Sequence, residues 1–567
     1  MGTIGGILDV AGRSLRAQSQ VIRVIGDNIA NVNTPGYSRR NAELVATQAT
    51  GTGNLLNGTG VDVQRVVRNV DEFLNREYLT RISDRAAADV RQQYLSRAEE
   101  PFSLEQTPGH IGYQLSQFFS SLQDLQSSPA DLPLRTQVLQ SGQALVSSIK
   151  DTYNQIASLQ READTRLANA VTNVNTLSQQ IADINGQIVS GETANQQNLT
   201  LRDNRDELLR KLSELVPVNT LELANGEVQV TIANGFALVD GSKTNQLQFA
   251  TVPDFSSAQL ALDGGSLGFI VHDYDPTTPN SQSDFTGLLS ASSGEIGGLL
   301  RLRGARNSAS TLTDPFSVSG DLPQIAARVE AISRDLLTRF NMTYRGYNPS
   351  QFTQTPAPTA PFAGDENPAT NAFDPSSGGL VDIPTPTNTN PGVYGLFTIT
   401  NTIADTNADG LANDLTANGY SNYSSQLSFG VTDERNLATA LDLDANPNSR
   451  QFSPGDAQNI AHLLTLRTQQ VTHSVGGTNG FTATATIEDV YNQAVSYSGS
   501  ASATAKSDFQ AKDAREAQVK ELHSAASGVS IDEELAKLIN YQRAFQASAK
   551  MIKTGDELFD EIIQLIR

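Results

Sequence analysis

The residues best suited to chemistry in this sequence form one short acidic segment. Asp405, Asn407 and Asp409 place side-chain oxygens at its first, third and fifth positions, with Gly410 at the sixth. That spacing is typical of the start of a calcium-binding loop, but Thr416 stands at the twelfth position, where such loops carry a bidentate Glu. An ordinary turn rich in Asn and Asp is the alternative interpretation. The segment predicts a weak calcium site, and we expect no other cofactor.

The other reactive residue types do not form a catalytic pattern. The chain has five histidines without the His-Glu-x-x-His spacing of zinc enzymes, and it has no cysteine. It also lacks a phosphate-binding loop and the Gly-x-Ser-x-Gly turn that presents a nucleophile. We therefore expect a protein that is not an enzyme.

Length, charge and apolar content limit the class of protein further. The chain has 567 residues, with 40 Lys and Arg against 61 Asp and Glu, for a net charge of -21. This length suits about three or four domains. No long basic run is present, which argues against nucleic acid as a partner because phosphate binding needs clustered cations. No apolar run approaches the roughly 20 residues of a membrane-spanning helix, and no signal-peptide pattern is visible. We expect neither nucleic-acid binding nor membrane insertion.

Both ends of the chain show the apolar spacing of helices that pack against another helix. The steps alternate between four and three residues, which is typical of a coiled coil. The N-terminal seam runs through Ile4, Leu8, Ala11, Leu15, Gln18, Ile22, Ile25, Ile29 and Val32. The C-terminal seam runs through Ile531, Leu535, Leu538, Gln542, Phe545, Ala549, Ile552, Asp556, Phe559, Ile563 and Ile566. We predict that the two ends pair, with two separately packed amphipathic helices as the alternative.

The middle of the chain alternates between helical and strand-like texture. A third seam from Val146 to Ile188 predicts one helix of about 60 Å, at 1.5 Å per residue. Alternating apolar residues between 222 and 289, with Asn-Gly turns at 225–226 and 234–235, predict a small β region. A stretch rich in Pro, Thr, Asn and Gly, followed by further alternation, predicts a second β insertion. Further helices are expected at 71–98, 201–215, 322–340 and 457–468.

These patterns together predict an α+β multidomain protein. It has paired N- and C-terminal coiled-coil helices, an elongated helical bundle and inserted β-rich domains. We expect the terminal coiled-coil domain at 1–45 with 525–567, and the helical bundle at 46–220 with 290–349 and 452–524. A small β region is expected at 221–289, and a β-rich surface insertion at 350–451.

A sharp stop follows the first seam. Thr34 precedes Pro35 and is disfavoured in helical conformation, and Pro35-Gly36 suits a type II turn. Asn33 tolerates the conformations found at a helix C-terminus. On spacing alone, the segment predicts the end of a helix.

The same segment resembles a known family signature. The run from Asn28 to Arg40 resembles the N-terminal signature of the bacterial flagellar rod, hook and hook-associated axial proteins, and the run from Gly528 to Lys550 resembles their C-terminal signature. Internal segments at 202–209, 293–303 and 454–459 are most similar to hook-associated members. Residues 344–351 and the Pro-rich stretch after them do not match clearly.

The resemblance implies a structural role at the junction between hook and filament, outside the cell, after type III export without signal-peptide cleavage. The implied partners are further copies of the chain in a ring, the hook protein, the next hook-associated junction protein and a cytoplasmic export chaperone. The implied assembly residues of the N-terminal motif are Asn28, Asn31, Asn33, Thr34, Pro35, Gly36, Tyr37 and Arg39. Those implied for assembly and chaperone binding on the C-terminal helix are Ile531, Leu535, Leu538, Tyr541, Phe545, Ile552, Phe559 and Ile563. The alternatives are a rod or hook subunit, or a secreted adhesin or hydrolase whose activity resides in the 350–451 insertion.

Overall fold

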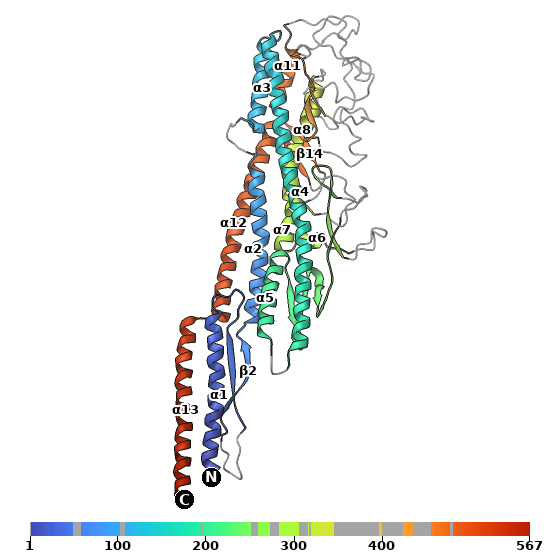
Figure 1. The fold of residues 1–567 in the computed structure, drawn as a ribbon. Coiled ribbons are helices and arrows are strands. Elements are labelled where there is room, and N and C mark those ends of the chain that lie inside the picture. The colour runs from blue at the N-terminus through green and yellow to red at the C-terminus, as the bar shows by residue number, and fades with distance from the viewer. Residues whose placement is uncertain are drawn as a thin grey trace.

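The protein is long and mostly helical, and both chain termini lie at the same end of the molecule (Figure 1). No helix among the described residues is long and apolar enough to cross a membrane. The computed structural model describes residues 2–48, 58–102, 108–193, 197–250, 259–272, 283–305, 316, 319–344, 396–399, 423–434, 437, 439, 455–476 and 480–566.

The two ends of the chain form one structural unit. Helix α1 (Gly2–Ala30) packs antiparallel to α13 (Ile531–Ile566), which confirms the predicted pairing of the ends. Strands β1 (Arg40–Ala46) and β2 (Val61–Arg68) form an antiparallel hairpin that also contacts α1. We call α1, α13, β1 and β2 the terminal unit.

Helix α1 is covered on two sides, because α13 and the hairpin both pack against it. Its buried apolar side chains are Ala11, Ala17, Val21, Val24 and Ile25. Leu15, Ile22 and Ile29 of the predicted seam are only half-buried. The apolar face of α1 is therefore broader than a single heptad seam.

The rest of the described chain forms a helical bundle, which we call the body. Its longest element is α4 (Leu132–Gly191), a 60-residue helix that confirms the predicted long seam and begins earlier than expected. Leu145, Ile149, Ile156 and Leu167 are among its fully buried side chains. The other main helices of the body are α2 (Glu72–Glu99), α3 (Ile111–Ser127), α5 (Leu199–Leu215), α7 (Gly294–Arg303), α8 (Asp321–Asp335) and α12 (Ile487–Ser527).

Shorter helices complete the body. The predicted helix at 322–340 is α8 followed by a π-helical segment, η3 (Leu336–Phe340). The predicted helix at 457–468 is α11 (Gln458–Thr465). The remaining short elements are α6 (Thr286–Ser290), α9 (Asn341–Tyr344) and the 3-10 turn η1 (Ala233–Gly235).

A four-stranded antiparallel sheet lies in the predicted small β region, in the order β3-β4-β5-β6. Val228, Val230 and Ile232 alternate inward on β4, and Gly226 in the turn before it has a φ of 86°. The predicted hairpin at 225–226 is therefore confirmed. The strands of this sheet are β3 (Asn219–Glu222), β4 (Val228–Ile232), β5 (Phe236–Asp240) and β6 (Lys243–Thr244).

Smaller sheets lie along the body. A three-stranded sheet has the order β11-β10-β7, and the others are two-stranded pairs. They comprise β7 (Gln248–Ala250), β8 (Gln259–Leu260), β9 (Ser266–Leu267), β10 (Phe269–His272), β11 (Ser283–Asp284), β12 (Phe397–Ile399), β13 (Leu427–Phe429), β14 (Val471–Val475) and β15 (Phe481–Ala485).

The predicted β-rich insertion is described only in part. Within it, β12 pairs with β13, and Phe397 and Phe429 pack against Phe118 of α3. Asp405, Asn407 and Asp409 lie outside the described residues. The calcium site and the predicted domain boundaries therefore stay predictions.

Candidate assembly site

The N-terminal motif begins where α1 ends in a tight turn. The amide of Thr34 donates to the carbonyl of Asn31 at 2.9 Å, and that of Tyr37 donates to the carbonyl of Thr34 at 3.2 Å. Pro35 and Gly36 occupy the centre of the second turn, and Gly36 has a φ of 79°. A positive φ at this position defines a type II turn, so the predicted turn type is confirmed.

Asn28 is the buried centre of the motif. Its Nδ2 donates to the backbone carbonyl of Arg40 and to Oε2 of Glu534, both at 2.9 Å. Its Oδ1 accepts from the Tyr37 hydroxyl at 2.9 Å and from the Arg40 amide at 3.0 Å. Both donors and both acceptor positions of the carboxamide are thus used, which removes the cost of burying it.

Glu534, on the first turn of α13, is the counterpart of Asn28. Only 1% of it is exposed. Besides Asn28, its carboxylate contacts Nε of Arg39 at 3.4 Å and Nζ of Lys537 at 3.0 Å. Two cations and an amide donor surround this buried charge, and a buried carboxylate needs such partners.

Arg39 also ties the motif to the chain that leads into α13. Its Nη1 contacts Glu533 at 2.9 Å, and its backbone amide donates to the carbonyl of Ser527 at 2.8 Å. The side-chain amide of Asn69, which follows β2, donates to the carbonyl of Ala526 at 2.7 Å. The motif therefore holds both the last residues of α12 and the first turn of α13.

Tyr37 is a neutral donor in this cluster. Burial raises the pKa of Tyr37 to about 12, and the nearby Arg40 opposes that rise. The Arg40 guanidinium lies 4.8 Å from the centre of the Tyr37 ring, a cation–π distance. The hydroxyl therefore keeps its proton and its bond to Asn28 at physiological pH.

The other motif residues lie at the surface. Asn33, Thr34 and Pro35 are exposed, and Asn31 is half-buried. The Thr34 hydroxyl donates to Oδ1 of Asn31 at 3.2 Å, so this pair stabilises the turn itself. The structure brings Asn28, Tyr37 and Arg39 together with α13, but not Asn31, Asn33, Thr34 or Pro35.

The predicted residues of α13 fall on two faces. Leu538, Tyr541, Phe545 and Ile552 are half-buried at the heptad spacing of Glu534 and Ser548, which bond to α1. We call this side the inner face. The predicted residues that stay exposed are Ile531, Leu535, Phe559 and Ile563.

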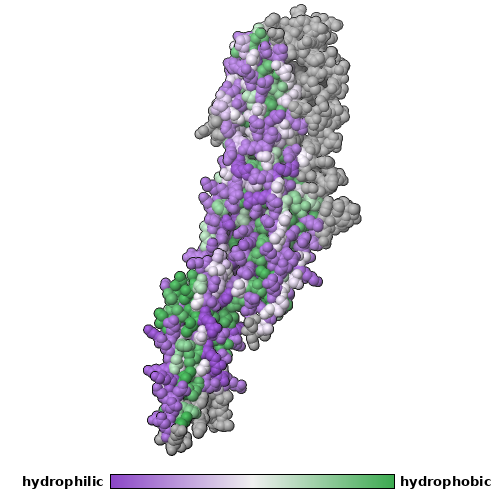
Figure 2. All heavy atoms as spheres, in the orientation of Figure 1, coloured by the Kyte–Doolittle hydropathy of each residue, from purple (hydrophilic) through white to green (hydrophobic). Residues whose placement is uncertain are grey.

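We call the exposed apolar side of α13 its outer face. It also includes Ile539, Met551, Leu558 and Ile562. Figure 2 shows apolar atoms gathered along the terminal unit, most densely near the upper end of α13. Their involvement in assembly stays a prediction.

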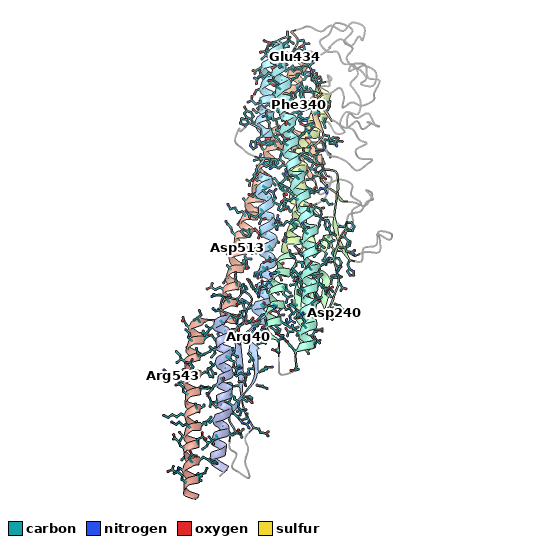
Figure 3. The ribbon with its side chains drawn as sticks, in the orientation of Figure 1. Arg40, Asp240, Phe340, Glu434, Asp513 and Arg543 are labelled. Atoms are coloured by element: carbon teal, nitrogen blue, oxygen red, sulfur yellow. The ribbon has the colours of Figure 1, made fainter. Side chains whose placement is uncertain are left out.

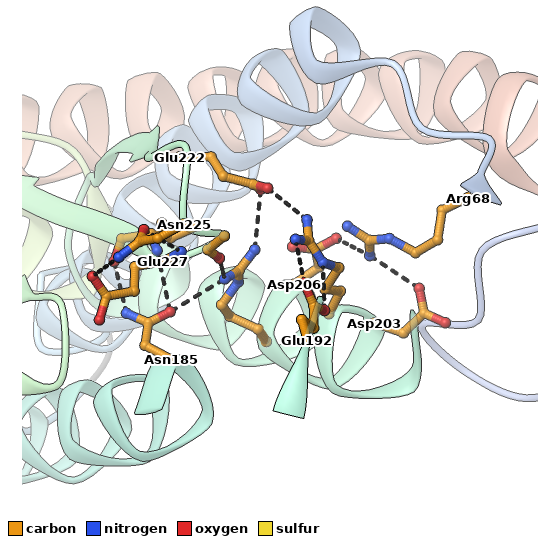
Figure 4. Close-up of polar contacts among 12 residues, drawn as sticks. Arg68, Asn185, Glu192, Asp203, Asp206, Glu222, Asn225 and Glu227 are labelled. Carbon is orange, nitrogen blue, oxygen red and sulfur yellow. Dashed lines mark hydrogen bonds and ion pairs between the residues drawn. The ribbon is translucent and has the colours of Figure 1, made fainter. Parts of the chain in front are cut away.

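The sequence analysis did not anticipate a charged contact between the terminal unit and α5. Nη2 of Arg40 lies 3.4 Å from Asp203, and Nη1 of Arg68 lies 3.0 Å from Asp203 and 2.7 Å from Asp206. Figure 3 shows Arg40 where the hairpin meets the body, and Figure 4 shows Arg68 facing the two aspartates. The only sequence signal was that Arg40 and the two aspartates lie in segments that resemble family signatures, whereas Arg68 lies outside them.

An adjacent side of α5 is fixed to the body. Arg205 is fully buried, and its Nη1 donates to the Gly226 carbonyl at 2.6 Å and to Oδ1 of Asn185 at 3.2 Å. Asn185, fully buried in α4, also donates to the carbonyls of Val228 and Gly241 (Figure 4). Helix α5 therefore connects the body, through Arg205, with the terminal unit, through Asp203 and Asp206.

Three family models match this chain. The model "Flagellar hook-associated protein FlgK helical domain" matches residues 95–348. "Flagella basal body rod protein" matches 8–37, and "Flagellar basal body rod FlgEFG protein C-terminal" matches 523–565. The two terminal matches cover α1 and α13, and the internal match covers much of the body.

Curated relatives match over nearly the whole length. Flagellar hook-associated protein 1 of Escherichia coli (strain K12) is 25% identical over 595 residues, covering 99% of both chains. The protein of that name from Salmonella typhimurium is 24% identical with the same coverage. That from Bacillus subtilis is 23% identical, covering 98% of this chain and 97% of its own.

A solved structure shares the fold. The flagellar hook junction protein FlgK from Burkholderia pseudomallei superposes with a TM-score of 0.53 at 15% sequence identity. The match covers 80% of this chain and 100% of that chain. The internal family match favours a hook-associated protein over a rod or hook subunit, although both ends carry rod-type motifs. The chain therefore belongs to the flagellar hook-associated protein 1 family, and it is a structural, extracellular component of the hook-filament junction rather than an enzyme.

Proposed function

We propose that this subunit joins hook to filament by packing the outer face of α13 against further copies of the same chain. Eight of the seventeen exposed large apolar side chains among the described residues belong to α13, and this observation carries the proposal. Ile531, Leu535 and Ile539 follow one another at four-residue spacing and so form one stripe. Burial of each such side chain contributes about 1.5–3 kcal/mol.

The far side of the terminal unit supports a contact between unlike surfaces. Leu44 and Val45 of the hairpin are exposed, as is Ile7 of α1. A surface on one side of a subunit that meets a different surface on its neighbour generates a ring when the rotation closes. We propose that the outer face of α13 packs against the α1 and hairpin side of the next copy, which would produce a ring.

Charge adds to this match. Arg16 and Arg23 are exposed on α1, whereas Asp556, Glu557, Asp560 and Glu561 are exposed near the end of α13. Opposite charges across an interface favour encounter and fix its register. We propose that the exposed residues Asn33, Thr34 and Pro35 contact the hook protein or the next hook-associated junction protein at the ends of this ring.

The test is a double substitution on the outer face, Leu535→Glu with Ile539→Glu, in cells that lack the native subunit. Two buried charges prevent packing, so we expect no junctions on isolated hooks to which the purified variant is added. Leu522→Glu is the matched control, because Leu522 is exposed to 51% on α12 outside the terminal unit. Normal junctions with the double variant would exclude the outer face as the assembly surface.

We also propose that a cytoplasmic export chaperone holds α13 before export. A helix with one face against α1 and a second apolar face exposed suits an apolar groove on a partner. The chaperone should bind the full chain and lose binding to a chain that ends at residue 530. N-terminal sequencing of junctions from cells tests export without cleavage.

A further inference from the structure

The terminal unit and the body meet through a small polar contact. Among the described residues, no helix or strand of the body packs extensively against α1, α13, β1 or β2. The contact consists mainly of hydrogen bonds and ion pairs made by residues around Arg40 and Arg68. Small polar contacts between domains leave their relative orientation adjustable unless something braces it.

Two chain crossings form the centre of this contact. The chain passes from β2 to α2 at Asn69 and from α12 to α13 at Gly528. The amide of Asn69 donates to the carbonyl of Arg39 at 2.7 Å, and the amide of Arg39 donates to the carbonyl of Ser527 at 2.8 Å. These backbone hydrogen bonds hold the two connecting segments together at one point. A single point of attachment does not fix the angle between the terminal unit and the body.

The ion pairs to α5 lie to one side of that point. Asp203 and Asp206 are three residues apart, and so they face the same side of α5. Arg68 contacts both carboxylates, while Arg40 contacts Asp203. Although burial opposes it, the charges of Asp206 and Asp203 raise the pKa of Arg68, so its cation persists.

The base of this contact is held by buried polar side chains. Arg202 contacts Glu192 at 2.8 Å, and both side chains are about nine-tenths buried. Arg205, on the same side of α5, and Asn185 of α4, which accepts from it, are fully buried. A displacement of Arg40 or Arg68 therefore moves the terminal unit, not α5.

We propose that Asp203 and Asp206 of α5, through Arg40 and Arg68, are positioning residues that set the angle between the terminal unit and the body. These contacts are ion pairs that remain partly hydrated, since side-chain exposure is 19% for Arg40 and 10% for Arg68. Partly hydrated ion pairs permit a change in the angle between the two units that a packed apolar interface would prevent. A subunit that joins hook to filament needs an adjustable angle between its terminal unit and its body, because the two units contact different neighbours.

The test measures this angle in assembled junctions. The chain has no cysteine, so Lys553→Cys on α13 and Asp183→Cys on α4, both exposed, accept one spin label each. Labelled subunits are diluted with unlabelled ones, and electron–electron double resonance gives the distance between the two units. With Arg40→Gln and Arg68→Gln together, we expect the distance distribution to broaden about twofold.

Two variants make the result specific. Arg65→Gln is the matched control, because Arg65 lies on the same strand and pairs at 2.7 Å with Glu43 inside the hairpin. It should leave the distribution unchanged. Arg40→Lys with Arg68→Lys keeps both positive charges opposite Asp203 and Asp206 and should retain the narrow distribution, which a role that depends only on the size of the arginine side chains would not predict.

Three outcomes would overturn the proposal. The first is an unchanged distribution in the double Gln variant, and the second is equal broadening in Arg65→Gln. The third is loss of junctions in the double Gln variant while Arg65→Gln still assembles, because the ion pairs would then serve subunit contacts. Since the parent particles supply the reference, this test is readable even if the outer face of α13 is not the assembly surface.

Discussion

Nδ2 of Asn28 and Oε2 of Glu534 lie 2.9 Å apart in the buried space between α1 and α13, although 505 residues separate them along the chain. Asn28 also accepts from Tyr37 and Arg40, so the end of α1, the turn after it and the start of α13 share one hydrogen-bond network. A buried charge stays stable only while its partners remain in place. The start of the C-terminal helix therefore depends on the N-terminal motif.

Replacement of Asn28 by Ala should loosen α13 at its start. The change leaves the Glu534 carboxylate and the Arg40 carbonyl without one donor each, which costs about 1–3 kcal/mol for a buried acceptor. We expect faster hydrogen exchange in the first turns of α13, measured on the full chain in assembled junctions, with α4 unchanged.

Asn31→Ala is the control for that change. Asn31 belongs to the same motif and donates to the Asp27 carbonyl at 2.9 Å, but in an exposed position where water replaces the bond. Its effect should stay within about 0.5 kcal/mol. Equal exchange rates in both variants would mean that the Asn28–Glu534 bond does not stabilise α13.

Local chemistry made part of this site predictable. Thr34, Pro35 and Gly36 specify a helix end and a type II turn from their backbone preferences alone, and both are present. The heptad seams predicted that the ends pair. They did not identify the second covered side of α1, because the hairpin that covers it was not recognised. Strand β1 reads Arg-Asn-Ala-Glu-Leu-Val-Ala, without the alternation that marks a strand with one buried face.

The joint at α5 could not be derived from spacing. Arg40 and Asp203 are 163 residues apart, and neither belongs to an apolar pattern. Glu533 follows Ser530 at the spacing of a capping box, yet its carboxylate contacts Arg39. Charged residues signal their partners only through the tertiary fold, whereas apolar periodicity reports the face that is buried.

Gly36→Ala should destabilise the motif turn. Its φ of 79° is unfavourable for any residue with a Cβ, at about 1–2 kcal/mol, and the added Cβ would lie 3.1 Å from Nη2 of Arg210. Gly26→Ala is the matched change within α1, where nothing lies within 4 Å of the new atom. It should stabilise the helix by up to about 1 kcal/mol. Hydrogen exchange of the Tyr37 and Arg40 amides distinguishes the two, and no difference would contradict the role given to Gly36.

Arg205→Ala should release the sheet at the base of α5. The loss leaves the Gly226 carbonyl without the Arg205 donor, at about 1–3 kcal/mol for a buried acceptor. Oδ1 of Asn185 loses one of its two donors and keeps the Val228 amide at 3.2 Å. Exchange of the β4 amides in the full chain measures the effect. Lys211→Ala, whose ion pair with Glu207 is exposed and 3.9 Å long, should change protection by no more than about 0.5 kcal/mol. Comparable losses in both would show that α5 is not held through Arg205.

His523 of α12 should make the stability of the body depend on pH below neutrality. Its ring lies 5.3 Å from that of Tyr78. Burial lowers the pKa of His523, and Arg210 lowers it further, while Asp206 and Asp71 oppose the shift. The folded chain thus favours the neutral ring, so its contribution is complete above the unfolded pKa of about 6.5 and is lost as pH falls through the folded value.

His523→Gln removes this titration and should flatten the loss of stability as pH falls below about 6.5. It should not abolish that loss, because burial also lowers the pKa of His473 and of His462. Measurement at pH 8 is the internal control, since the imidazole is neutral there in both states and only the lost ring contact with Tyr78 remains. A pH dependence identical to that of the parent would mean that His523 is as easily protonated in the folded chain as in the unfolded one. Burial against Tyr78 would then not disfavour the charged ring.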